Sequence, residues 1–266
     1  MTHWGPDDIP WADFRPERLD PGLLRLVKAA ALVERNAGDY TTYLKTVFRA
    51  EPAFLAVADG WERDEVQHGE VLARYATLAD PDFDFARRFR RFVEGYRIPL
   101  DRTDSVRGSL TGELLARCIV ETGTSSMYSA LRDATDEPVL RQICHRIAGD
   151  EFRHYKLFYT LLQVLAQRER PSLWRRVLVA AGRLNEADDD ELSFAWFAAN
   201  EPIGAAYDRA ACARRYASGA FRHYRDAHAE RAVNMVFKAV GLDPKGWLAG
   251  VAKRFAKRRL SALAAA

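Results

Sequence analysis

The chain has 266 residues, of which 48% are hydrophobic, and its formal net charge is +3. This length can bury a substantial core in one large domain or two small ones. The charge is too small to make nucleic acid the default partner. The three cysteines, Cys118, Cys144 and Cys212, form no Cys-x-x-Cys pair, which argues against a disulfide framework, a zinc ribbon or a rubredoxin-type site.

The first 20 residues are acidic and rich in proline, and they lack the basic start and apolar run of a signal peptide. No later segment has the roughly 18 apolar residues that a transmembrane helix needs. Together with the cysteine usage, this predicts a soluble cytoplasmic protein with no transmembrane segment.

From residue 21 onward, apolar residues recur at spacings of three and four while β-branched alternation is scarce, so the sequence predicts an all-α protein. Prolines and acidic caps mark the helix starts. Four long helices are expected at residues 21–48, 52–79, about 104–111 to 135, and 138–168. The first two must form an antiparallel hairpin, and the connection after residue 79 has room for one short helix.

The expected organisation has three parts: an N-terminal extension (1–20), a four-helix bundle (21–168) and an additional helical region packed on the bundle (169–266). The additional region should contain several shorter helices, with boundaries near Asp190, Pro202 and Gly219.

Ionisable residues interrupt the apolar stripe of the helix at 52–79. The stripe contains Phe54, Val57, Trp61, Glu65, His68, Leu72 and Tyr75. Glu65 and His68 therefore stand at the centre of a face that should be buried. The helix at 138–168 repeats this arrangement, with Glu151 and His154 at the centre of the stripe Leu140, Cys144, Ile147, Glu151, His154, Phe158, Leu161 and Leu165.

The two other long helices each carry one glutamate, Glu34 or Glu121, within their apolar stripes. Glu34 precedes Glu65 by 31 positions and Glu121 precedes Glu151 by 30, so each half of the bundle is a hairpin with a Glu followed by a Glu-x-x-His. A lone Glu-x-x-His is weak evidence, because most such pairs are solvated neighbours on a helix surface. The joint pattern, however, matches the four-helix di-metal arrangement.

Four carboxylates in one bundle core would repel one another and would have to protonate, because burying an unpaired charge costs several kcal/mol. Two divalent cations would cancel the four charges. Carboxylates and imidazoles in a ratio of four to two favour iron or manganese over calcium, magnesium or structural zinc. The expected cofactor is two iron ions, with manganese as the alternative.

Two segments carry a family resemblance. "WERDEVQHGEVLARYATL" and "ICHRIAGDEFRHYKLFYTLL" resemble the two Glu-x-x-His helices of the acyl-(acyl-carrier-protein) desaturases, which belong to the ferritin-like di-iron carboxylate superfamily. The resemblance covers approximately residues 30–165 and implies a ferritin-like four-helix bundle.

Carried over residue by residue, the resemblance implies six iron ligands: Glu34, Glu65, His68, Glu121, Glu151 and His154. It also implies that Thr124 faces the oxygen site in a catalytic role and that Asp150 holds a metal-bound imidazole. The chain is shorter than the plant enzymes, and it has Asp64 in place of a glutamate and Gln67 in place of an arginine. These departures bear on substrate and electron delivery, because the ligands are intact.

The chemistry that the resemblance implies is activation of dioxygen by a reduced di-iron pair and removal of two hydrogens from adjacent methylenes of an acyl chain. The sequence contains no GxGxxG or Walker motif for a nucleotide, so the electrons should come from an external ferredoxin-like donor. We expect the protein to be a homodimer.

Two basic stretches are candidates for docking acyl carrier protein, although a solvated helix face is the commoner explanation of such stretches. They comprise Arg87, Arg88, Arg90, Arg91 and Arg97, and Lys245, Lys253, Arg254, Lys257, Arg258 and Arg259. In the second stretch Trp247, Leu248, Val251 and Phe255 form an apolar face, which would pack on the bundle or lie on a membrane surface.

Two rival functions stay open. One is a ferritin- or rubrerythrin-like protein that oxidises iron or reduces peroxide, although a rubrerythrin usually carries a Cys-x-x-Cys iron module. The other is a regulatory or scaffold protein that has kept the site without its activity. Cys118 should be a small buried residue, and His145, His223 and His228 should be surface or interhelical residues because they lie off the stripes.

Overall fold

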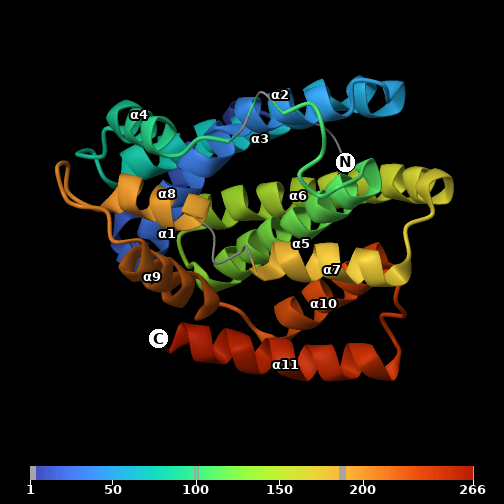
Figure 1. Ribbon diagram of the computed structural model, residues 1–266. Helices are drawn as coiled ribbons and strands as arrows, with labels where there is room; N and C mark the ends of the chain where they lie inside the picture. The colour runs from blue at the N-terminus through green and yellow to red at the C-terminus, as the bar shows by residue number, and fades with distance from the viewer. Residues whose placement is uncertain (1–3, 99, 101, 186–189, 266) are drawn as a thin grey trace.

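The structure is a computed structural model that describes residues 4–98, 100, 102–185 and 190–265 (Figure 1). Over these residues the regular secondary structure is helical and contains no strand, which confirms the all-α prediction.

Five helices form two hairpins, because the first of the four expected helices is divided in two. In the first, α1 (Pro21–Arg35) and α2 (Ala37–Val47) pack against α3 (Pro52–Ala79). In the second, α5 (Leu110–Ala134) packs along α6 (Pro138–Glu169), and α3 also contacts α6. The expected spans agree with these helices, except that the predicted helix at 21–48 is interrupted at Asn36. The apolar stripes of α1, α3, α5 and α6 face one another, so the polar residues within them are buried.

Side-chain caps explain why these helices begin where they do. Asp20 accepts hydrogen bonds from the backbone nitrogens of Gly22 and Leu23, with Pro21 at the first helical position. Ser109 caps α5, and Glu137 caps α6. Each cap supplies an acceptor for backbone N–H groups that have no partner inside the helix.

The interruption at Asn36 lies two residues after Glu34. The backbone N–H of Asn36 donates to the carbonyl of Val33 at 3.1 Å, so the chain makes a tighter turn before α2 begins. Asparagine favours such turns over a helix interior, a local effect that apolar periodicity does not report. Glu34 therefore lies in the last turn of α1, next to α3.

Gly69 allows α1 and α3 to approach closely at this level. A Cβ atom on Gly69 would lie 2.6 Å from the backbone nitrogen of Arg35 and 2.7 Å from its Cα. Since Arg35 follows Glu34 and Gly69 follows His68, the missing side chain brings these two site residues together.

The helix expected in the connection is α4 (Phe85–Gly95). Two of its arginines bind α8 (Asp190–Asn200): Arg88 donates to the carbonyls of Ala198 and Glu201, and Arg91 donates to those of Phe197, Glu201 and Pro202. The guanidinium of Arg91 also lies 3.8 Å from the ring centroid of Phe197. These two arginines hold the carboxyl end of α8, whereas Arg87 and Arg90 are exposed.

The remaining helices are α7 (Leu173–Asn185), α9 (Arg209–Phe221), α10 (Asp226–Val240) and α11 (Trp247–Ala264). Helices α8 and α9 pack against α1, while α7 and α10 pack against α5. Asp190 begins α8 and Pro202 follows it, but the boundary expected at Gly219 is wrong. Gly219 lies inside α9, where a Cβ atom would be 3.6 Å from Leu26, an ordinary contact distance, so this glycine marks neither a helix end nor a close approach.

Helix α11 packs on α9 and α10 along the outside of the molecule (Figure 1). The apolar face of α11 points to solvent: Trp247, Leu248, Val251 and Phe255 are all exposed. Of the two expectations for this face, packing on the bundle is therefore wrong. Among the described residues no helix has both the length and the apolar character needed to cross a membrane.

The N-terminal extension is packed on the bundle. Trp4 and Ile9 are buried in the same apolar core as residues of α1, α3 and α6. The backbone nitrogen of Arg15 donates to the cap residue Glu137, which fixes this segment beside the start of α6.

Substituting Gly69→Ala tests the close approach of α1 and α3. Because the new methyl group would meet backbone atoms of Arg35, we expect the free energy of unfolding to fall by about 1–3 kcal/mol. Gly60→Ala in the same helix is the matched control, since the nearest atom to its new Cβ would be 3.8 Å away. It should raise stability by roughly 0.5–1 kcal/mol. Urea unfolding measures both variants, and equal effects would contradict this account.

Candidate metal centre

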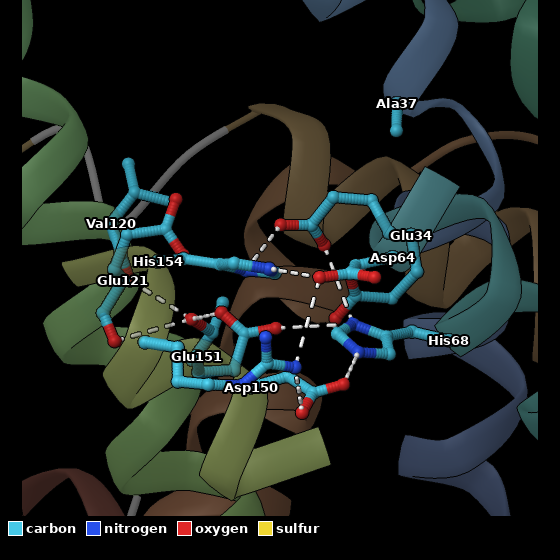
Figure 2. Close-up of polar contacts among 12 residues, drawn as sticks. Glu34, Ala37, Asp64, His68, Val120, Glu121, Asp150, Glu151 and His154 are labelled. Atoms are coloured by element: carbon cyan, nitrogen blue, oxygen red, sulfur yellow. Dashed lines mark hydrogen bonds and ion pairs between the residues drawn. The ribbon is translucent and has the colours of Figure 1, made fainter. Parts of the chain in front are cut away.

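Six buried side chains meet at the middle of the bundle (Figure 2). They come from four helices: Glu34 from α1, Glu65 and His68 from α3, Glu121 from α5, and Glu151 and His154 from α6. None is more than 7% exposed. These are the six residues that the sequence predicted to be ligands, and the fold brings all of them together.

The six residues form two overlapping groups that could each hold a metal ion. One group is Glu34, Glu65, His68 and Glu151, and the other is Glu65, Glu121, Glu151 and His154. Within each group the ligand atoms lie within 4.8 Å of one another. Glu65 and Glu151 belong to both groups, so the two positions are adjacent and share two carboxylates.

The two imidazoles point the same kind of nitrogen into the cluster. His68 Nδ1 lies 3.3 Å from Glu151 Oε1 and 3.5 Å from Glu65 Oε2. His154 Nδ1 lies 3.1 Å from Glu65 Oε1 and 3.8 Å from Glu121 Oε2. Both Nδ1 atoms and Glu151 Oε1 are buried, and among the described residues none of the three has a partner in good hydrogen-bond geometry. Buried polar atoms rarely lack partners, so these three fit a bound cation.

The other imidazole nitrogens are held by two aspartates in a reciprocal arrangement. His68 Nε2 of α3 lies 3.1 Å from Asp150 Oδ2 of α6, and His154 Nε2 of α6 lies 3.2 Å from Asp64 Oδ2 of α3. A carboxylate at Nε2 fixes the ring and leaves Nδ1 to bind a metal. Arg153 lies 2.5 Å from Asp150 and 3.7 Å from Asp64, and so balances both charges.

Asp64 is a site residue that the sequence reasoning treated only as a departure from the family motif. A signal for it was present, because Asp64 precedes Glu65 just as Asp150 precedes Glu151, giving the repeat Asp-Glu-x-x-His. Trp4 was also missed. Its Nε1 donates to Asp150 Oδ2 at 2.7 Å, and its ring stacks on His68 at a centroid distance of 6.2 Å.

Three side chains hold three of the carboxylates from outside the cluster. The Tyr128 hydroxyl donates to Glu34 Oε1 at 2.5 Å, Arg117 Nη2 donates to Glu121 Oε1 at 3.0 Å, and the Thr124 hydroxyl donates to Glu151 Oε2 at 2.5 Å. Thr124, predicted to be catalytic, thus contacts a carboxylate that both groups share. Its catalytic role stays a prediction.

The pKa values of the carboxylates are shifted by their burial and by the charges of their neighbours in the cluster. Burial raises the pKa of Glu34 well above its usual range, and the charges of Glu65 and Glu151 add to the shift. Burial likewise raises the pKa of Glu121, although Arg117 opposes the shift. For Glu65 burial acts in the same direction but is outweighed by His154 and His68, which hold its pKa well below the usual range.

The imidazoles show the complementary effect. Burial lowers the pKa of His68, but the carboxylates of Asp150, Glu151 and Glu65 outweigh burial and raise it well above the usual value. Asp64 and Glu65 raise the pKa of His154 in the same way. Without a cation, protons on Glu34, Glu121 and the two imidazoles therefore neutralise the cluster.

The other residues singled out in the sequence lie outside the cluster. Cys118 is fully buried, and burial raises the pKa of its thiol, so the thiol stays protonated. His228 lies between helices, 3.0 Å from Asp133 of α5. His145 is exposed and His223 half-buried.

A cavity of about 210 Å³ lies beside the cluster, between α2, α5, α7 and the segment after α4. It reaches Arg117 and Val120, the neighbours of Glu121 on α5, and is lined at other points by Tyr40, Tyr43 and Tyr96. A larger hollow of about 590 Å³ lies along the opposite face of α3 from Glu65 and His68, and the residues that line it do not belong to the cluster.

No protein-family model matches the chain, and no curated protein matches it.

Substitution of single carboxylates should change the metal content in steps. We expect the wild-type chain to hold about two divalent cations, one in each group. Glu34→Gln removes a ligand from one group and should leave about one cation, whereas Glu65→Gln removes a shared ligand and should weaken both positions. Metal analysis after loading with Fe(II) or Mn(II) and desalting measures this.

The control is Glu113→Gln, which changes a buried glutamate of α5 that binds Tyr43 and Ser105 instead of the cluster. It should keep the full metal content. Retention of both cations by Glu65→Gln, or equal losses in Glu65→Gln and Glu113→Gln, would contradict the shared-ligand arrangement.

Metal binding should release protons from the cluster. Glu34, Glu121, His68 and His154 have raised pKa values, so they carry protons in the metal-free chain and must lose them to bind cations. Affinity should therefore rise with pH until these groups have lost their protons. Titration calorimetry in buffers of different ionisation enthalpy counts the protons, and a heat that does not depend on the buffer would disprove the protonated cluster.

Proposed function

We propose that the chain is an oxygen-activating non-haem di-iron oxidoreductase, related to the acyl-(acyl-carrier-protein) desaturases that its sequence resembles. The observation that carries the proposal is the sharing of Glu65 and Glu151 between two groups that each include one histidine. Such a pair of sites holds two cations side by side, and a set of four carboxylates and two imidazoles favours iron or manganese. Iron is the proposed metal because it supports dioxygen chemistry.

When bound, the two iron ions would supply the electrons and the Lewis acidity that dioxygen activation needs. The protein surrounds the cluster with buried side chains and fixes its imidazoles and carboxylates by hydrogen bonds. His68 is fully buried, the aspartates at Nε2 fix both rings, and Arg117 holds Glu121. Such a shell keeps bulk water away from the reacting groups.

Thr124 is the residue to which we give a role in proton transfer. Its hydroxyl donates to Glu151, and it also lies 3.3 Å from the carbonyls of Val120 and Glu121, so it can exchange acceptors by rotation about one bond. Val120, one turn before Thr124 on α5, lines the cavity of about 210 Å³. We assign to Thr124 the role of holding a proton at the shared carboxylate of Glu151.

The electrons require an external donor. Removal of two hydrogen atoms from a substrate by one dioxygen molecule consumes two further electrons and two protons and forms two water molecules. A ferredoxin-like carrier is the proposed source, because the sequence has no glycine-rich nucleotide motif.

A single-turnover experiment tests the proposal. The iron-loaded chain is reduced without oxygen, mixed with candidate acyl thioesters and exposed to dioxygen, and products are identified by mass spectrometry. We expect one substrate to lose two hydrogens. Continued iron oxidation into a mineral with no change in any organic substrate would overturn the proposal in favour of a ferritin-like function, and catalytic loss of added peroxide would favour a rubrerythrin-like one.

Thr124→Val supplies the residue-level test, with Thr122→Val as the matched control on the same helix. The Thr122 hydroxyl donates to the carbonyl of Cys118 and not to the cluster. Losing one hydrogen bond to a charged group should slow the oxygen reaction about tenfold in Thr124→Val. Thr122→Val should change the rate little, and Thr124→Ser should restore it.

A further inference from the structure

Helix α11 presents an apolar stripe to solvent. Trp247, Val251 and Phe255 follow one another at intervals of four residues and are 77%, 45% and 65% exposed. Leu248, beside them, is 46% exposed. Residues spaced by four lie on one face of a helix, so these side chains form a continuous strip.

The opposite side of α11 makes the contacts with the rest of the molecule. Ala249 is buried, and Ala252 and Ala256, which lie on the same side, are half-buried. The helix is therefore attached to α9 and α10 through the side that carries these alanines, while Trp247 and Phe255 face outward. Exposed aromatic residues in a strip of this kind mark an interaction surface.

Basic residues accompany the apolar strip. Between residues 247 and 264 the sequence has five basic residues and no acidic one. Lys257 is held by Asp226 and Glu230 of α10, but Arg254 and Arg258 are exposed on the side of Trp247 and Val251. Among the described residues these two arginines form no ion pair.

We propose that α11 is a membrane-docking helix that places Trp247, Val251 and Phe255 in the interface of an anionic lipid bilayer. A surface helix with aromatic and aliphatic residues on one face and arginines beside them is the composition of interfacial helices. Arginine stems can lie along the apolar surface while their guanidinium groups reach lipid phosphates. The proposal does not depend on the metal centre.

Two other occupants fit the surface less well. In a two-fold dimer through α11, the arginines of one copy would face those of the other, because such an interface pairs the same patch with itself. An acidic carrier protein would match the charge of the arginines, but this match would not account for the exposure of Trp247 and Phe255. A bilayer satisfies both the charge and the apolar strip.

Vesicle flotation of the full chain tests the proposal. The vesicles contain phosphatidylcholine alone or with phosphatidylserine, at low and at high salt. We expect binding to the phosphatidylserine vesicles that weakens with salt, because the attraction is screened. Arg254→Gln with Arg258→Gln should lower affinity about 25-fold, from roughly fivefold for each basic residue.

Trp247→Ser with Phe255→Ser should also lower the affinity, by about tenfold or more. The matched control is Arg87→Gln with Arg90→Gln, which removes the same charge from exposed positions of α4 and should leave binding nearly unchanged. Circular dichroism and metal content confirm that each variant folds.

Wild-type chain that does not float, or α11 variants that float as well as the control, would overturn the proposal. It would also be overturned by a dimer that dissociates in Trp247→Ser with Phe255→Ser. Binding of acyl carrier protein through these residues in the absence of any vesicle affinity would likewise assign the surface to a protein partner.

Discussion

The burial of four carboxylates in one helical core is the constraint on which the rest of the structure depends. Glu34, Glu65, Glu121 and Glu151 lie where an ordinary bundle would have leucine, and none is more than 7% exposed. Their repulsion must be balanced by protons or by cations. The pKa shifts within the cluster show how protons do this, and the two groups with shared ligands show how two cations would.

The two halves of the bundle solve this problem together. Asp64 and Asp150 each bind the histidine of the other half, so neither Glu-x-x-His helix orients its own imidazole. The position of each ring therefore depends on contact between α3 and α6. In the same way, the positions of Glu34 and His68 relative to each other depend on the close packing of α1 against α3 at Gly69. The geometry of the site is therefore correct only when the two halves of the bundle are packed correctly.

The sequence predicted the ligands because each lies at a regular position in an apolar stripe. Residues spaced by three and four lie on one face of a helix, so the position in the stripe tells that the side chain points into the bundle. Helices α1, α3 and α6 begin at the prolines where they were expected, Pro21, Pro52 and Pro138, for the same reason: the signal is local. The contacts that were missed are distant in sequence. Trp4 reaches Asp150 across 146 positions, and Arg88 and Arg91 of α4 hold α8 more than 100 positions away. Helical spacing cannot predict contacts between residues so far apart in the sequence. The break at Asn36 was missed for another reason: it depends on one local turn, whereas the apolar pattern is judged over many residues.

Glu65 differs from the other three carboxylates in what holds it. Tyr128, Arg117 and Thr124 each donate to one of the others from outside the cluster, whereas the contacts of Glu65 in the described structure are with members of the cluster. Its low pKa accordingly depends on the two imidazoles, despite its burial. If cations took up the two imidazole nitrogens, Glu65 would have no donor among the described residues outside the cluster to fix its orientation. Since Glu65 is also shared by both groups, it would be the ligand best able to adjust if two cations were bound, while Tyr128, Arg117 and Thr124 would hold the other three carboxylates in place.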